Sequence, residues 1–166
     1  VQSNRAAVAD FFGRPADRLQ SVHQTHSAQV QILTAPLSDA PKADAMVTAT
    51  AGVILGVLTA DCQPVLFHDA KAGVIGAAHA GYKGAKLGVL QNTLAAMETL
   101  GARRQDICAV IGPCISQKAY EVGPEFLEEI CHDAPDALRF FAQGKGDRYQ
   151  FDLPSYSLDQ LRAAGI

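Results

Sequence analysis

Val74–Gly88, VIGAAHAGYKGAKLG, and Leu58–Pro64, LTADCQP, are the two segments on which the prediction of the sheet and of the functional site rests. Each stretch begins as an apolar run and ends in a reactive side chain among small residues. This side chain is His79 in the first stretch and Cys62 in the second. A thiolate and an imidazole that converge form either a metal site or a nucleophile–base pair. We therefore expect the functional site to lie where these two stretches meet.

Three apolar runs in this region predict a β-meander. They are Val53–Thr59, Val65–Phe67 and Val74–Ala78, and each has the composition of a strand. In a meander the first and third strands run in the same direction, as neighbours of the middle strand. Their C-terminal ends would then lie on one edge of the sheet, which would bring Cys62 and His79 close together.

Periodic segments elsewhere predict further strands and helices. Helical spacing is clearest for Leu87, Leu90, Leu94 and Met97, which recur three or four residues apart before Gly101 closes the helix. Further strands are expected at residues 30–33, 43–48 and 107–111, helices at residues 5–12, from Pro124 and from 152 to 165, and a loop at 142–148. This irregular alternation predicts mixed sheets flanked by helices rather than a regular doubly wound sheet.

Length and charge bound the class of protein. A chain of 166 residues is most simply one domain with a substantial core. Its net charge of -3 provides no basic surface for nucleic acid. No apolar run reaches the roughly 20 residues of a membrane helix, and nothing near Val1 resembles a signal peptide. We therefore expect a soluble protein of the cytoplasm.

The cysteines do not form a recognisable framework. Cys62, Cys108, Cys114 and Cys131 show no C-x-x-C spacing, which argues against a zinc ribbon and a thioredoxin-type motif. A disulfide framework is not expected at this chain length. Cys108 lies in an apolar run and Cys131 near a helix end, so both are expected to be inert, with Cys108 in the core.

His26, in the polar segment QTHS, is the third candidate ligand, and His23 could take its place. Two imidazoles and one thiolate are the three protein ligands of a catalytic zinc that keeps a fourth position open for water. The wide spacing of His26, Cys62 and His79 matches no short metal motif, so a hydrogen-bonded turn histidine remains the alternative for His26. A metal-free pair, with Cys62 as nucleophile and His79 as base, also remains open.

Asp61 and the glycine-rich segment have both a structural and a functional interpretation. Asp61 either satisfies N–H groups of a turn or accepts a hydrogen bond from a ligand histidine. Gly81 and Gly84 either allow close helix–sheet packing or, with the charge of Lys83, favour an anion at a helix N-terminus. Cys114 follows Gly-Pro in a turn, where it either lines the site or is merely small enough to fit.

Successive blocks of the sequence resemble the YfiH-like family. They are QTHS, ADAMVT, LTADCQPVLF, GAAHAGYKG, IGPCI, YEVGPEF and FDLPSY, and they extend over nearly the whole chain in the family's order. Members are labelled laccase-domain or polyphenol oxidase proteins in older usage and purine nucleoside phosphorylases in newer usage. The resemblance implies an α+β fold, a four-layer α/β/β/α sandwich of mixed sheets.

The resemblance also implies a metal and an activity. The metal would be zinc, held by His26, Cys62 and His79. The activity would be phosphorolysis of adenosine, inosine, guanosine and methylthioadenosine, with adenosine deamination as a second reaction. The partners would therefore be a purine nucleoside and phosphate.

The chain departs from the family pattern at a few positions. It has Tyr82-Lys83 where the family usually has Trp-Arg, and Ser27 where the family usually has Gly. A lysine keeps the charge of arginine but loses its bidentate fork for phosphate. Members usually extend beyond both ends of this chain, so residues 1–166 are expected to form one catalytic domain that lacks the family's terminal segments.

Two further function classes remain as alternatives. A laccase-like copper oxidase needs several copper ions and many more histidines than the five in this chain. A metal-binding or interaction module that kept the fold without turnover is the non-enzymatic alternative.

Overall fold

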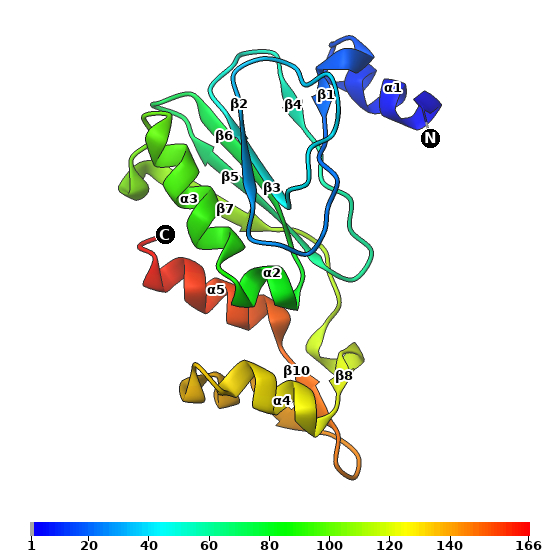
Figure 1. The fold of residues 1–166 in the computed structure, drawn as a ribbon, viewed down its shortest axis with the longest axis vertical. Helices are drawn as coiled ribbons and strands as arrows, with labels where there is room; N and C mark the ends of the chain where they lie inside the picture. Colours follow the sequence, from blue (N-terminus) through cyan, green and yellow to red (C-terminus); the bar gives the residue numbers. More distant parts are fainter. Residues whose placement is uncertain (1) are drawn as a thin grey trace.

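The computed structural model describes residues 2–166, and its centre is a five-stranded mixed sheet (Figure 1). The strands lie in the order β2 (Val30–Leu33), β3 (Ala45–Thr48), β6 (Val74–Ala80), β5 (Gln63–Asp69) and β7 (Ile107–Ile111). Strands β2 and β3 are parallel, and the other neighbours are antiparallel. The predicted class, α+β with mixed sheets and flanking helices, is confirmed.

Helices cover one face of this sheet. In β5, Val65 and Phe67 are buried while Leu66 and His68 are exposed, because successive side chains of a strand point to opposite faces. Helix α3 (Val89–Thr99) packs on the buried face, and α5 (Leu153–Ala163) lies beside it (Figure 1). The main core is therefore a sheet–helix layer.

The predicted long helix is α3, which begins at Val89 rather than at Leu87. Leu90, Leu94 and Met97 are fully buried in α3, as their spacing predicted. Leu87 is 63% exposed and was wrongly placed in this stripe. It follows a separate short helix, α2 (Tyr82–Lys86), because Gly88 adopts a left-handed conformation with φ of 89° and turns the chain.

The predicted meander is wrong. Its first run forms only β4 (Ile54–Leu55), which pairs in parallel with β1 (Leu19–Gln20) in a separate two-stranded sheet. The neighbours of β5 are β6 and β7, so the strands next to the site are an antiparallel hairpin. Composition marks each run as a strand, but pairing depends on contacts with distant segments such as Leu19–Gln20.

A smaller, aromatic core lies at the end of the molecule that carries α4 (Pro124–Cys131) (Figure 1). Pro124 begins α4, and Asp152 caps α5 by accepting from the backbone N–H of Ser155 at 3.0 Å, so both predicted helix starts are confirmed. The predicted loop at 142–148 is partly wrong, because residues 142–143 end a strand and only residues 144–148 form the turn of a hairpin. The hairpin belongs to a three-stranded sheet with the order β8 (Glu121–Val122), β10 (Tyr149–Phe151) and β9 (Phe141–Gln143).

Helix α1 (Gln2–Phe11) begins earlier than predicted and ends before Gly13. The remaining elements are short 3₁₀ helices: η1 (Ala16–Arg18), η2 (Arg104–Asp106), η3 (Gln117–Ala119) and η4 (Pro135–Phe140). Within residues 2–166, no helix combines the length and the apolar character needed to cross a bilayer.

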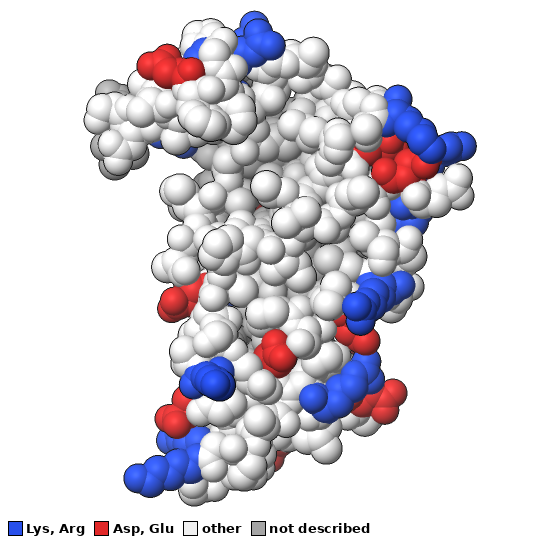
Figure 2. All heavy atoms as spheres, turned by 180° about the vertical axis from the view of Figure 1, so that it is seen from behind, with Lys and Arg blue, Asp and Glu red and all other residues white. Residues whose placement is uncertain are grey.

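The second face of the central sheet carries no helix layer. Cys108 of β7 is exposed on this face rather than buried in the core as predicted, because an apolar strand does not reveal which of its faces is covered. Leu66 and Val110 are 53% and 63% exposed on the same side. Figure 2, the view from behind, shows charged atoms mainly around the rim of a large uncharged area.

Candidate active site

His26, Cys62 and His79 meet beside the end of β6. One ligand atom from each lies within 4.8 Å of the other two. Nε2 of His26 is 3.8 Å from Sγ of Cys62, and the two imidazole rings cross edge to face with centroids 4.8 Å apart. Cys62 directly precedes β5, and Pro64 of β5 pairs with His79 of β6. The two residues are therefore close because of antiparallel hairpin register and not because two parallel strands end together.

Asp44, which directly precedes β3, fixes the orientation of His79. The Nδ1 atom of His79 lies 2.9 Å from Oδ1 of Asp44, and both side chains are buried. An ionised carboxylate only accepts hydrogen bonds, so Nδ1 carries the proton. The lone pair of Nε2 is then free for a metal ion, an arrangement typical of metal-bound histidines that donate to a carboxylate.

The same carboxylate holds the loop that carries His26. It accepts from the backbone N–H groups of Thr25, His26 and Ser27 at 3.1, 3.0 and 2.6 Å. His26 has φ of 59°, and no other non-glycine residue in 2–166 has a positive φ. This conformation costs free energy for most residues other than glycine. The three hydrogen bonds to Asp44 offset that cost and hold the loop in place.

These hydrogen bonds also control the charge of Asp44. Burial by itself raises the pKa of the carboxyl group, but the hydrogen bonds from His79, Ser27 and Thr25 outweigh it and lower the pKa to about 2. Asp44 is therefore ionised throughout the neutral range and provides a fixed negative charge behind the two imidazoles.

The three side chains fit a metal ion. Zn–S bonds of about 2.3 Å and Zn–N bonds of about 2.0–2.1 Å in a tetrahedral site place ligand atoms roughly 3.5 Å apart. The His26–Cys62 separation of 3.8 Å is close to this value. One thiolate and two imidazoles suit zinc or copper. This group can therefore bind a metal ion with a fourth position left for solvent or substrate.

Cys62 is not activated as a free thiolate. Burial raises the pKa of its thiol, and the negative charges of Asp61 and Asp44 raise it further. Without a cation the thiol stays protonated at neutral pH, which disfavours a metal-free cysteine nucleophile. A bound metal ion deprotonates a coordinating thiol, so the same surroundings suit a metal ligand.

Close packing accounts for both glycines of the segment after His79. A Cβ atom on Gly81 would lie 2.7 Å from Sγ of Cys62 and 3.2 Å from Cδ2 of His26. One on Gly84 would lie 3.2 Å from the carbonyl oxygen of Ser27. Glycine at these positions lets α2 approach the loop that carries His26.

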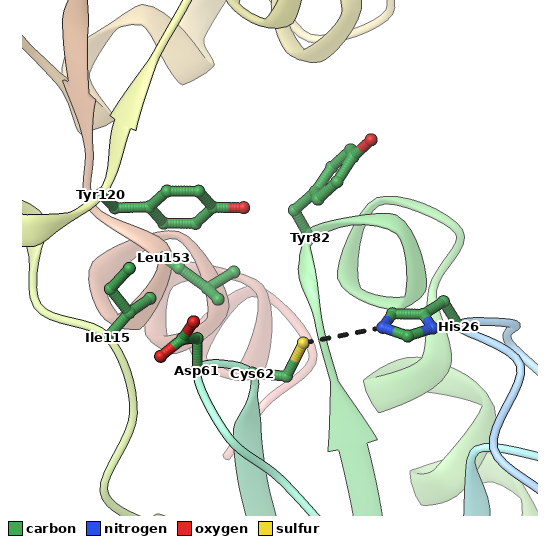
Figure 3. Close-up of a pocket in the computed structure, with 7 residues that line it drawn as sticks. All are labelled: His26, Asp61, Cys62, Tyr82, Ile115, Tyr120 and Leu153. Carbon is green, nitrogen blue, oxygen red and sulfur yellow. Dashed lines mark hydrogen bonds between the residues drawn. The ribbon is translucent and has the colours of Figure 1, made fainter.

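A cavity of about 250 Å³ opens beside the metal-ligand group (Figure 3). Two of the expected ligands and the expected Asp61 line it, together with four residues that the sequence did not predict as site residues. The lining is formed by His26, Asp61, Cys62, Tyr82, Ile115, Tyr120 and Leu153.

The other predicted site residues lie around this cavity. Asp61 lines it, but among the described residues its side chain forms no hydrogen bond to a histidine; Asp44 has the orienting position. Lys83 is exposed and does not line the cavity, although its Nζ lies 5.8 Å from the ring centre of Tyr82. Cys114 is half-buried outside the lining, and burial raises the pKa of its thiol.

Asp44 was missed because ADAMVT was interpreted only as a strand. The available signal was an aspartate inside an otherwise apolar run, since a buried carboxylate needs a partner. Tyr120 was missed as well. Burial, together with Cys62 and Tyr82, raises the pKa of its phenol to about 12, so it is a neutral group in the cavity wall.

Comparisons with known proteins agree with this architecture. A family model described as multi-copper polyphenol oxidoreductase laccase matches residues 1–166. A Mycobacterium tuberculosis protein named purine nucleoside phosphorylase is 38% identical over 167 residues, which cover 100% of this chain and 66% of the relative. A Deinococcus radiodurans protein of the same name is 40% identical over 173 residues and is covered to 64%.

Solved structures show the same fold. A Neisseria meningitidis protein superposes with a TM-score of 0.88 at 36% identity, covering 98% of this chain and 65% of that one. The Bacillus licheniformis hypothetical protein YfiH superposes with a TM-score of 0.91 at 29% identity, covering 100% of this chain and 66% of that one. The chain thus spans about two thirds of the length of its relatives.

Proposed function

Because the chain belongs to the multi-copper polyphenol oxidoreductase laccase family, several of whose curated members are named purine nucleoside phosphorylase, we propose that it is a zinc-dependent purine nucleoside phosphorylase. The observation that carries this proposal is the convergence of His26, Cys62 and His79 beside a small cavity. Residues 1–166 would form one catalytic domain, which in the relatives belongs to a chain about half as long again.

Zinc is the metal that we propose. Two imidazoles, one thiolate and an open fourth position are typical of catalytic zinc, and the carboxylate behind His79 is the partner such a ligand needs. The family's description mentions copper, but a multi-copper oxidase needs several clustered copper sites. Within residues 2–166, His26, Cys62 and His79 are the only three His, Cys, Asp or Glu side chains whose ligand atoms all lie within 4.8 Å of one another.

The proposed reaction is phosphorolysis of adenosine, inosine, guanosine or methylthioadenosine, with adenosine deamination as a second activity. Phosphate forms a bond to C1′ of the ribose while the bond from C1′ to the purine breaks, and the electron pair of that bond leaves with the base. A bound zinc ion supplies Lewis acidity and a water of lowered pKa. In this proposal Asp61 accepts from the ribose hydroxyls, and Lys83 attracts the phosphate to the rim of the cavity.

The test is the substitution Cys62→Ala with Cys108→Ala as its matched control. Cys62→Ala should abolish both bound zinc, measured by elemental analysis, and the release of adenine from adenosine and phosphate. Cys108 is exposed on β7, so its loss should change neither. Full turnover by Cys62→Ala would refute the proposal.

A chelation experiment separates the proposal from a cysteine hydrolase. Removal of the metal should abolish turnover, and added zinc should restore it. A hydrolase that uses Cys62 as its nucleophile would instead keep its activity after chelation and lose it after alkylation of the thiol.

A further inference from the structure

Two tyrosine rings frame the cavity on the side away from His26. Tyr82 begins α2, and Tyr120 directly precedes β8. Both rings pack against Phe126, with ring centres 4.6 and 5.9 Å away, and Tyr120 also packs against Phe151 at 5.7 Å. The aromatic core thus supports both rings from behind, so little conformational entropy remains to be lost when a ligand binds.

The two rings do not pack on each other. The aromatic contacts of the described residues include no Tyr82–Tyr120 pair, and the cavity lies between the two side chains. Figure 3 shows the hydroxyl of Tyr120 pointing across the cavity toward Tyr82, with Asp61 and Cys62 below. A flat group that enters the cavity therefore meets both tyrosine side chains close to His26 and Cys62.

The cavity has an apolar half and a polar half. Tyr82, Tyr120, Ile115 and Leu153 provide aromatic and aliphatic surface, whereas His26, Cys62 and the carboxylate of Asp61 provide polar groups. A nucleoside has the same division, since its base is flat and its sugar carries hydroxyl groups. A nucleoside that places its base against the apolar residues of the cavity places its ribose beside Cys62.

We propose that Tyr82 and Tyr120 bind the nucleobase by stacking, which directs C1′ of the ribose toward the metal ligands and favours ligands that carry a flat heteroaromatic base. This inference rests on the proposed function, because it assigns the orientation of the substrate within the same site. Stacking of a base on an aromatic side chain contributes roughly 1–3 kcal/mol to binding and tolerates different bases, because every base has a π-face.

The test uses paired substitutions in the metal-loaded protein. Tyr82→Leu and Tyr120→Leu remove a ring but keep apolar volume, while Tyr82→Phe and Tyr120→Phe keep the ring. Tyr149→Leu is the control, because Tyr149 packs on Phe141 and does not line the cavity. Calorimetry with adenine and, separately, with ribose 1-phosphate gives the dissociation constants, and zinc content and thermal midpoint are measured for each variant.

Each leucine variant in the pocket should raise the dissociation constant for adenine by about 5- to 150-fold. The constant for ribose 1-phosphate should change less than about threefold, as should both constants in the phenylalanine variants and in Tyr149→Leu. Unchanged adenine affinity in both leucine variants would overturn the inference, as would an equal loss of affinity for both ligands.

A second measurement does not depend on the folding of the leucine variants. The chain has four tyrosines, so their ring resonances can be assigned by NMR from single Tyr→Phe substitutions. Adenine should shift the resonances of Tyr82 and Tyr120 and leave those of Tyr149 unchanged. Shifts absent from both pocket tyrosines would overturn the inference.

The two proposals fail in different ways. Adenosine turnover in the wild type together with unchanged adenine affinity in the leucine variants would overturn the base-binding role and leave the phosphorylase intact. Loss of adenine binding in those variants, in a protein that turns over no nucleoside, would support the base-binding role and refute the phosphorylase.

Discussion

Asp44 connects the parts of the site that lie far apart in the sequence. One oxygen contacts His79 on β6, and the two oxygens together accept from the loop of Thr25, His26 and Ser27. It therefore fixes both the tautomer of one candidate ligand and the unusual backbone of the other. A residue that would never touch the metal determines whether the ligands face one another.

Asp44→Asn should lower zinc affinity about 10- to 100-fold, as loss of a hydrogen-bond partner behind a metal ligand typically does. The amide keeps the shape of the side chain but removes the charge and replaces one acceptor oxygen with a donor group that faces N–H groups. Competition with a chromogenic chelator measures the affinity. Asp61→Asn, which removes a charge near Cys62 but no hydrogen bond to a candidate ligand, should change it much less; a larger loss for Asp61→Asn than for Asp44→Asn would contradict this assignment.

Lys83→Ala should raise the KM for phosphate several-fold and leave the KM for adenosine and the zinc content nearly unchanged. Lys83 has no carboxylate within ion-pair distance among the described residues, so its charge is available to an anion. Lys71→Ala is the control, because Lys71 already pairs with Asp106 at 2.6 Å. An equal KM for phosphate in wild type and Lys83→Ala would exclude this role.

At the scale of elements, the β5–β6 hairpin positions two of the three candidate ligands. Its register places His79 opposite Pro64, two residues after Cys62. At the other end of the hairpin, Asp69 accepts from the backbone N–H groups of Lys71, Ala72 and Arg103 at 2.9, 3.0 and 2.9 Å. Asp69 thus fixes the turn of the hairpin and joins it to the segment before β7.

These hydrogen bonds make the stability of the hairpin depend on pH. Those from Ala72 and Arg103 are the main reason that the pKa of Asp69 is lowered. The stabilisation is therefore fully present above the unfolded pKa of about 3.9 and is lost as the pH falls through the lower folded pKa.

Asp69→Asn should lower the thermal midpoint at pH 7 and reduce the further loss of stability below about pH 4. Thermal unfolding of both proteins from pH 7 to pH 2, followed by circular dichroism, measures this difference. Parallel stability curves for the two proteins across that range would show that Asp69 contributes nothing to the acid sensitivity.

The sequence predicted those elements whose pattern is local. Strands β2 and β7, the buried stripe of α3 and the starts of α4 and α5 follow from periodicity and from Pro124 and Asp152. The partner of β4 could not be predicted, because Leu19–Gln20 is distant in the sequence. Likewise, His26, Cys62 and His79 were visible as reactive side chains, whereas Asp44 gains its role only through contacts made by folding.

At the scale of the whole molecule, the cavity lies between two cores. The sheet and its preceding loops carry His26, Cys62 and His79, while Tyr82 and Tyr120 pack on the aromatic core around Phe126. Chemistry and the proposed base binding thus depend on different parts of the fold. Substitutions in the aromatic core should therefore affect substrate affinity before they affect metal content.

The helix-free face of the central sheet is the largest uncharged area in the view of Figure 2. It includes an apolar groove of about 410 Å³ next to Leu66 and Ile75, and Val110 lies on the edge strand β7. An exposed apolar edge favours association, and natural edge strands counter it with charged residues.

Val110→Lys should reduce the binding of a hydrophobic dye such as anilinonaphthalene sulfonate and change the free energy of unfolding by no more than about 0.5 kcal/mol. Dye fluorescence and urea unfolding measure the two effects. Val110→Ala is the control and should reduce dye binding less. Unchanged fluorescence in Val110→Lys would show that this face does not bind the dye.

The candidate metal ligands are divided between a hairpin and a separate loop, and this division has a kinetic consequence for a bound ion. Pairing of β5 with β6 is enough to bring Cys62 and His79 together, so the hairpin alone would offer a metal ion a bidentate site. His26 can complete it only after its loop has closed over Asp44. An ion bound by Cys62 and His79 alone would have only two protein ligands and would dissociate faster than one bound by all three. The dissociation rate of the metal would therefore depend on how stably the loop of His26 is hydrogen-bonded to Asp44.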